Sequence, residues 1–263
     1  MIRNLRFIVA LLKLKLSRTM MYRLSFFGAT FVDGSLFILW LLMFKAIYSQ
    51  VDSIGGWSQG QTTVFLGTFS LLNAINMTIY FFGVIEIPDK IKTGDLDHYI
   101  TKPVSPLLRL TFENINIGSS PLIILSIWII LYGVSMLDTP IRTGNIILYI
   151  IFIILMAVLY YDMEVIIRTI PFFVISASNI QMLEGAIFEM CMRIPGVLFD
   201  RILKIIFYFI LPYGIIATVP AQILTGTASG RIIAMSLAIV TIFTMFTLWF
   251  WKFGLRHYKS ASS

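Results

Sequence analysis

Charged residues are scarce in this chain. Only 13% of its 263 residues are Asp, Glu, Lys or Arg, about half the share found in an average soluble domain. The hydrophobic share is 58%, and Phe alone occurs 22 times. A soluble surface needs a much larger charged fraction, so this composition excludes water as the main solvent. It predicts an all-α polytopic membrane protein, whose spans each need a run of about 20 apolar residues.

Residues for cofactor and catalytic chemistry are also few. The single cysteine, Cys191, permits no internal disulfide and no thiolate metal cage. The sequence has no phosphate-binding Gly-x-x-x-x-Gly-Lys-Ser/Thr loop and no His-Glu-x-x-His motif. No His or Lys lies deep in an apolar stretch, where Ser-based intramembrane hydrolysis would need one. We expect no cofactor, no metal and no catalytic residue on this chain, and an intramembrane enzyme is the disfavoured alternative.

The net charge of +7 is unevenly distributed along the sequence. Six Lys or Arg residues precede residue 24, and the first acidic residue is Asp33. Apolar residues recur at helical spacing over 1–23, which predicts an amphipathic helix on the cytoplasmic surface of the membrane. A cleaved signal peptide is the alternative, but no small-x-small cleavage site follows a short apolar core. This basic excess indicates topology and lipid contact and requires no nucleic-acid partner.

Seven apolar stretches are candidate spans. They cover residues 24–48, 62–85, 120–137, 145–161, 171–192, 202–224 and 231–253. Ser120-Pro121 is a helix-start signal for the third stretch. Asp162, Glu164 and Arg168 are expected to end the fourth and to form a short inner loop.

Both ends of the chain are basic, which places both in the cytoplasm and requires an even number of spans. Pro212 and Pro220 would break a lipid-facing helix, but such breaks are tolerated where protein shields the backbone. We therefore predict a re-entrant hairpin on the outer side at 196–228 and six transmembrane helices within one domain, 1–263. With that topology, 14 Lys or Arg residues are inside and 6 are outside.

A few polar residues fall within the predicted spans, where desolvation makes them costly. Asp33 in the first span and Asn179, Glu184 and Glu189 in the fifth are candidates for a translocation path. The alternatives are an ion pair of Asp33 with a nearby arginine or a neighbouring helix, and a contact of Glu184 and Glu189 with Arg193. No chain of acids extends through several spans, so a proton-coupled carrier would lack its relay.

The most charged internal segment is the predicted inner loop 86–109. Gly94 is placed to end a short helix, Asp95 to cap the next one, and Ser105-Pro106 to begin a third. Four apolar residues stand among the charges: Ile91, Leu96, Tyr99 and Ile100. This pattern predicts a short helical element beneath the membrane, with a face that docks on a partner.

The run IKTGDLDHYITKPVS at 91–105 closely resembles the signature of type-2 ABC exporter permeases, in particular a bacterial six-span subgroup. Residues 194–199, 211–212 and 219–226 also resemble that subgroup, and the resemblance extends over nearly the whole chain. It implies that residues 88–96 form the coupling helix, which sits in a groove of an ATPase subunit, and that the outer hairpin is present. The implied docking residues are Pro88, Asp89, Lys90, Ile91, Lys92, Gly94, Asp95, Leu96 and Asp97.

The resemblance implies the membrane subunit of an ATP-driven exporter in a bacterial plasma membrane. ATP and Mg would bind to two separate ATPase subunits, and a second permease, identical or related, would complete the assembly. An amphiphilic cargo would suit the aromatic and Met-rich composition, although membrane packing explains it equally well. The alternative function is an ATP-independent channel or an ion-coupled carrier.

Overall fold

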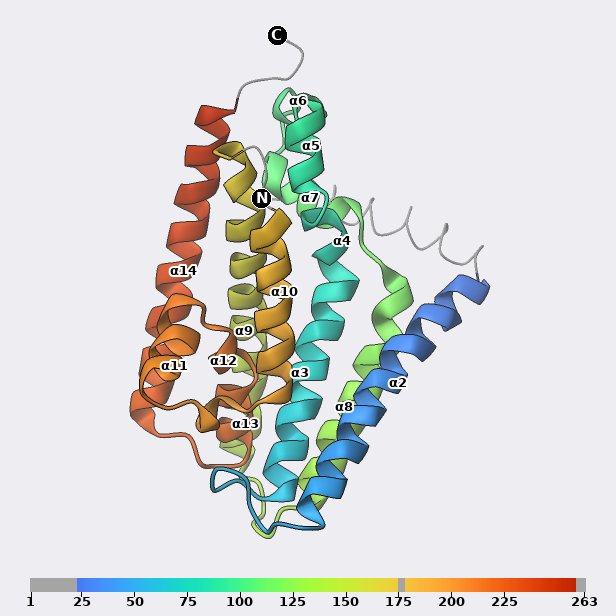
Figure 1. Cartoon of the computed structure of the whole chain (residues 1–263), viewed down its shortest axis with the longest axis vertical. Helices are drawn as coiled ribbons and strands as arrows, with labels where there is room; N and C mark the ends of the chain where they lie inside the picture. The colour runs from blue at the N-terminus through green and yellow to red at the C-terminus, as the bar shows by residue number, and fades with distance from the viewer. Residues whose placement is uncertain (1–22, 175–177, 259–263) are drawn as a thin grey trace.

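The computed structural model describes residues 23–174 and 178–258, and this part of the chain is built from helices, without a β-strand (Figure 1). Its six longest helices run roughly along the long axis of the molecule. They are α2 (Arg23–Tyr48), α3 (Gln59–Ile79), α8 (Ser120–Ser135), α9 (Thr143–Thr169), α10 (Ser178–Arg193) and α14 (Gly230–His257). The predicted amphipathic helix over 1–23 falls outside the described residues, except for Arg23 at the start of α2.

Within the described residues, four helical segments are long and apolar enough to cross a membrane. They are Gln59–Ile79, Ile117–Ser135, Thr143–Phe172 and Gly230–His257. A bent pair of helices makes a fifth if it is counted as one span. Apolar side chains such as Ile124, Ile154 and Met245 are exposed on α8, α9 and α14, as lipid-facing surfaces require. The chain is therefore a multi-pass membrane protein with four or five candidate spans.

The other two predicted spans correspond to α2 and α10. Helix α2 contains a shorter apolar segment, Gly34–Tyr48, and α10 has only 16 residues. The prediction of six spans therefore goes beyond the candidates that length and composition identify.

Helices α3 and α8 pack closely through glycine. A Cβ atom on Gly133 would lie 2.7 Å from the backbone nitrogen of Val64, and one on Gly67 would lie 2.7 Å from Cγ1 of Ile130. Small residues at such positions let two helix backbones approach each other, which is how apolar helices associate in a membrane. This pair forms the side of the molecule that also carries α2 (Figure 1).

Helix α9 is longer than the sequence pattern predicted. The inner loop expected at residues 162–168 is wrong, because α9 continues without a break to Thr169. The charged residues in this part of α9 are buried and have partners within α9 or on neighbouring helices, so they do not end the helix. The connection to α10 instead begins with the short 3-10 helix Ile170–Phe172, which contains Pro171.

Two other predicted boundaries also shift. The second apolar stretch was expected to run to residue 85, but α3 ends at Ile79, and the separate short helix α4 (Phe81–Val84) follows. The N-cap of α8 is Ser119 and not Ser120, with a 3-10 turn (Ile117–Ser119) before it.

The segment between α10 and α14 folds into short pieces. A 3-10 turn (Gly196–Leu198) is followed by α11 (Arg201–Ile205), a π-helical stretch (Ile206–Ile210), α12 (Tyr213–Ile216) and α13 (Thr218–Leu224). Its two arms, Arg201–Ile210 and Tyr213–Leu224, meet at 81°. Pro212 lies at the bend as expected, but Pro220 is the third residue of α13, where a helix does not need its backbone N–H. Helices α11–α13 stay in one half of the molecule (Figure 1).

Different structural elements lie at the two ends of the molecule. Two further short helices, α5 (Ile87–Thr93) and α6 (Asp97–Ile100), lie at the same end as the C-terminal end of α14 (Figure 1). The connections from α2 to α3 and from α8 to α9 lie at the opposite end, on the side of α11–α13. The charged segment 86–109 and the C-terminal end of α14 are therefore neighbours in space.

Candidate functional site

The charged segment is a compact unit of three short helices. Pro88 lies in the first turn of α5, where its missing N–H is not needed. Gly94 has φ of 83°, a left-handed conformation that favours glycine, and it ends α5 as the sequence predicted. The third helix, α7 (Pro106–Glu113), begins directly after Ser105, which was also predicted.

The apolar residues of this segment point inward. Ile87, Ile91, Leu96 and Tyr99 are buried in one cluster together with residues of α4 and α7 and with Val165 of α9 and Trp251 of α14. Leu96 and Ile87 are completely buried. The docking face expected from Ile91, Leu96 and Tyr99 is therefore wrong for these residues, because the rest of the same chain covers them. Ile100 alone of the four predicted apolar residues is exposed.

The outer surface of the segment is polar. Asp89 and Lys92 of α5 are exposed, as are Asp95 and His98 around the turn into α6. The predicted helix cap at Asp95 is not formed, because its carboxylate accepts a hydrogen bond from Thr93 Oγ1 at 2.8 Å and α6 has no side-chain cap. Any partner that docks on this segment would meet charged and polar groups rather than an apolar face.

Lys90 forms an ion pair at the start of the segment. Its Nζ lies 2.5 Å from Oε2 of Glu86, whose other carboxylate oxygen accepts a hydrogen bond from Asn114 at 2.8 Å. Partial burial alone would lower the pKa of Lys90, but its hydrogen bond to Glu86 and the nearby Glu113 carboxylate outweigh this and raise it. Arg109 also stacks over the ring of Tyr99 at 4.6 Å. Helix α5 is thus tied to the end of α7 and the residues beyond it.

The last predicted docking residue, Asp97, is half-buried and lies close to Tyr258, just past the end of α14. Burial raises the pKa of the Tyr258 hydroxyl, as do the charge of Asp97 and a hydrogen bond to it. The segment therefore contacts α14 at two levels, at Trp251 within the helix and at Tyr258 beyond it.

A second polar feature is buried between α9, α10 and α12. The guanidinium Nη1 of Arg168 lies 2.8 Å from Oε2 of Glu164 and 2.5 Å from Oε2 of Glu184. Tyr213 donates a hydrogen bond of 2.8 Å to the other oxygen of Glu184. All four residues are at most 6% exposed. These four residues are named the ion network below.

The ion network joins segments that are far apart in the sequence. Glu164 and Arg168 are one helical turn apart on α9, Glu184 is on α10, and Tyr213 begins α12. Of these residues, sequence reasoning identified only Glu184 as a candidate, and it placed Glu164 and Arg168 in a loop. The spacing of four residues between an acid and a base within a helical run was a signal that could have found the pair.

The other predicted path residues lie apart from the ion network. Glu189 forms an ion pair with Arg193, as the alternative interpretation expected. Arg193 also lies over the ring of Trp40 at 4.4 Å, which links α10 to α2. Asn179 is exposed near the start of α10. Asp33 lies within α2, but its side chain is outside the described part of the structure.

The charged segment and the ion network meet on one stretch of α9. Val165 is fully buried in the apolar cluster under α5 and α6, while its neighbour Glu164 belongs to the ion network. A displacement of α5 and α6 would therefore act on α9 near Val165, in the same helical turns that form the ion pair with α10. Glu184 and Tyr213 of the ion network also line a mostly apolar cavity of about 420 Å³, which lies between α9, α10, α14 and the start of α12. Among the described residues, no group of His, Cys, Asp and Glu is suited to a metal ion.

One comparison with known proteins identifies a family for this chain. A protein-family model described as an ABC-2 family transporter protein matches residues 35–262, which is most of the chain. No curated protein and no solved structure gives a significant match. Membrane proteins of the ABC-2 family are permease subunits that work with separate ABC ATPases and are not ATPases themselves. With four or five candidate spans among the described residues and a family match over most of its length, this chain belongs to the ABC-2 transporter family.

Proposed function

We propose that this chain is the permease subunit of an ATP-driven exporter, moved by a separate ATPase that docks on α5 and α6. The observation that carries the proposal is the division of this segment into two faces. Asp89, Lys92 and Asp95 are exposed, whereas Ile91 and Leu96 are buried against the spans. A partner can bind the exposed polar face. The buried apolar residues beneath it, here called the apolar base, would transmit a displacement of this segment to the membrane helices.

The movement would travel along contacts that the structure contains. The apolar base packs on Val165 of α9 and Trp251 of α14. From α9, the ion network reaches α10 through Glu184 and α12 through Tyr213. Arg193 at the far end of α10 contacts Trp40 of α2. We therefore propose that docking shifts α10 relative to α2.

The proposed topology has six spans: α2, α3, α8, α9, α10 and α14. The segment α11–α13 forms a re-entrant hairpin on the outer side, supported by its 81° bend and by its place in the half of the molecule away from α5 (Figure 1). The C-terminal end of α14 lies beside α5 and α6, so it would be cytoplasmic together with the docking segment and the N-terminus. A bacterial plasma membrane is the proposed location.

The proposed assembly contains two such ATPases, which bind ATP and Mg, and a second permease that is identical or related. Asp33 and Asn179 would face the translocation path together with Glu189, while Glu184 holds the wall of that path in place through Arg168. Export is the proposed direction, and an amphiphilic molecule is the proposed cargo.

Co-purification tests the partnership. The chain is co-expressed with each candidate ABC ATPase and isolated in detergent through a tag on the permease. We expect one ATPase to remain bound through size exclusion and its hydrolysis rate to change when the permease is present. The absence of any stable ATPase partner would reject the proposal.

Charge reversal tests the docking surface. The double variant Asp89→Lys, Lys92→Glu changes two exposed side chains without touching the buried base. We expect it to lose ATPase binding while keeping the thermal stability of the wild type. Arg256→Glu, at an exposed position near the end of α14, is the matched control and should keep the ATPase. Normal ATPase binding by the double variant would show that α5 is not the docking site.

The alternative function, an ATP-independent channel or ion-coupled carrier, makes the opposite prediction. Proteoliposomes that contain the permease alone would then move cargo without ATP. Transport that requires both an ATPase and ATP, and that fails in the double variant, supports the exporter.

A further inference from the structure

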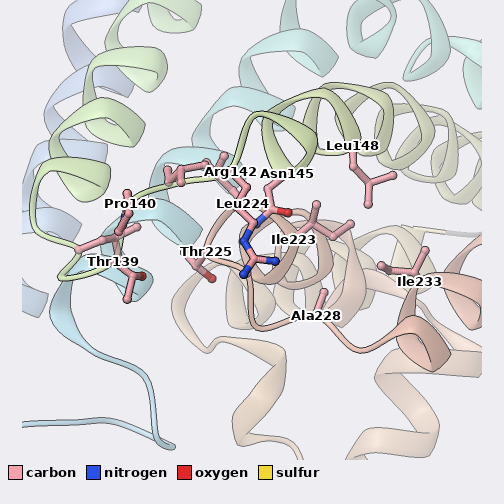
Figure 2. A pocket seen from close by; sticks show the side chains of 13 residues that line it. Thr139, Pro140, Arg142, Asn145, Leu148, Ile223, Leu224, Thr225, Ala228 and Ile233 are labelled. Atoms are coloured by element: carbon pink, nitrogen blue, oxygen red, sulfur yellow. The ribbon is translucent and has the colours of Figure 1, made fainter.

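A cavity of about 500 Å³ lies at the end of the molecule opposite α5 and α6. It is open to the surface and is lined by the connection between α8 and α9, the first turns of α9, the end of α13 and the start of α14 (Figure 2). Its volume falls within the range typical of small-molecule sites. Neither the docking segment nor the ion network contributes a residue to it.

The polar side of this cavity is positively charged. In Figure 2, the guanidinium of Arg142 extends into the cavity beside the amide of Asn145 and towards the end of α13. Arg142 is the only charged residue among the 13 that line the cavity. The acidic residue nearest to Arg142 in the sequence, Asp138, does not line the cavity. Among the described residues, no carboxylate forms an ion pair with Arg142. The guanidinium is therefore available to a ligand.

Hydroxyl and amide groups surround the guanidinium. Thr139 and Thr225 line the same cavity, and no hydrogen bond to the side chain of Asn145 occurs among the described residues. The first turn of α9 contains no acidic residue, so it adds the positive end of a helix dipole without opposing charge. Such a helix end alone would not define a site, but here it supports an arginine that already points into a cavity.

The opposite wall is apolar. Leu148 of α9, Ile223 of α13 and Ile233 of α14 line it. Beyond the cavity, α9 continues with exposed Ile147, Ile150 and Ile154, which form an apolar stripe that lipid tails can cover. A ligand that fills both sides has an acidic head and an apolar body.

We propose that this cavity binds an anionic group of the phosphate type, with Arg142 and Asn145 as its main hydrogen-bond donors. A guanidinium suits phosphate and carboxylate oxygens because it offers several N–H donors in one plane. Two sources share this chemistry, the headgroup of an anionic phospholipid and free phosphate. The proposal rests on the cavity alone and does not depend on the ATPase partnership.

Thermal unfolding of the purified full-length chain in neutral detergent tests the proposal. The midpoint is followed during titration with phosphatidylglycerol, with phosphatidylcholine and with inorganic phosphate, each at constant ionic strength. Arg142→Gln removes the guanidinium. Arg231→Gln is the matched control, because Arg231 lies at the same end of the molecule, at the start of α14, but does not line the cavity.

We expect phosphatidylglycerol to stabilise the wild type and Arg231→Gln to the same degree, and Arg142→Gln to bind about tenfold more weakly, as loss of one charge-assisted contact predicts. Stabilisation by inorganic phosphate that depends on Arg142 would identify a free anion as the source. Stabilisation by phosphatidylglycerol alone would identify the lipid headgroup. If Arg142→Gln folds poorly, Asn145→Leu provides the same comparison. Equal responses in wild type and Arg142→Gln, or equal stabilisation by phosphatidylcholine, would overturn the proposal.

Discussion

Closely packed glycines lie at the contact between α3 and α8, whereas a buried ion pair lies at the contact between α9 and α10. At the α3–α8 contact, Gly67 and Gly133 bring two backbones close, and no ion pair is formed among the described residues there. At the α9–α10 contact, Arg168 bridges Glu164 and Glu184 in a buried site. The close contact of two helix backbones allows only one relative position of the helices, whereas Arg168 can pair with either of two carboxylates. We therefore expect the two contacts to respond differently to substitution.

The strongest test of this comparison removes the centre of the ion network. Arg168→Met leaves Glu164 and Glu184 buried without their cation, and breaking such a pair costs about 3–5 kcal/mol. We expect a large fall in the midpoint of thermal unfolding in detergent. The neutral set Glu164→Gln, Arg168→Met, Glu184→Gln should recover most of the loss. Wild-type stability of Arg168→Met would show that charge does not hold α9 and α10 together.

Removal of one hydrogen bond gives a smaller effect. Tyr213→Phe takes away the donor to Glu184, and a hydrogen bond to a charged group contributes about 1.5–3 kcal/mol. Tyr208→Phe is the control, because Tyr208 is equally buried but its hydroxyl has no hydrogen-bond partner among the described residues. Denaturation curves of the two variants should separate clearly. Equal curves would mean that the contact between Tyr213 and Glu184 adds nothing to stability.

The packed contact is tested by adding a single methyl group. Gly133→Ala places a Cβ atom against the backbone of α3, and such overpacking costs about 1–3 kcal/mol. Gly185→Ala in α10 meets nothing within 4 Å, so it should be neutral or stabilise by up to about 1 kcal/mol through helix propensity. Opposite signs in unfolding experiments would confirm the comparison, and a destabilised Gly185→Ala would contradict it.

The smallest effect is expected at the exposed ion pair of α10. Glu189→Gln breaks its contact with Arg193, where both side chains are about half exposed, and such pairs contribute about 1 kcal/mol or less. The unfolding midpoint should barely change. A loss as large as that of Arg168→Met would show that this exposed pair contributes as much to stability as the buried ion network.

Much of the helical framework could be predicted from the sequence. Long apolar runs identified the helices later seen as α3, α8, α9 and α14, and local rules identified the left-handed end of α5 at Gly94 and the start of α7 after Ser105. These features depend on residues close together in the sequence, so periodicity and turn preferences carry the information.

The errors share one physical cause. Asp162, Glu164 and Arg168 were interpreted as the end of a span because charges are costly in an apolar environment. In the structure, Thr244 donates a hydrogen bond to Asp162 at 2.6 Å, and Arg168 pairs with Glu184 sixteen residues away. The apolar residues of the docking segment were likewise assigned to a partner, although Val165 and Trp251 of the same chain cover them. A partner on another helix, such as Glu184 for Arg168, cannot be inferred from a residue's own neighbours in the sequence.

The amino-acid sequence alone determined that this protein is helical and lies in a membrane, because 58% apolar residues and so few charges admit no other solvent. It also marked residues 86–109 as the charged segment most suited to a partner. Only the tertiary structure decided which face of that segment is free, and only it brought Glu164, Arg168, Glu184 and Tyr213 together. The sequence shows which residues are charged. Whether a charged side chain is buried depends on the residues that surround it in the folded protein.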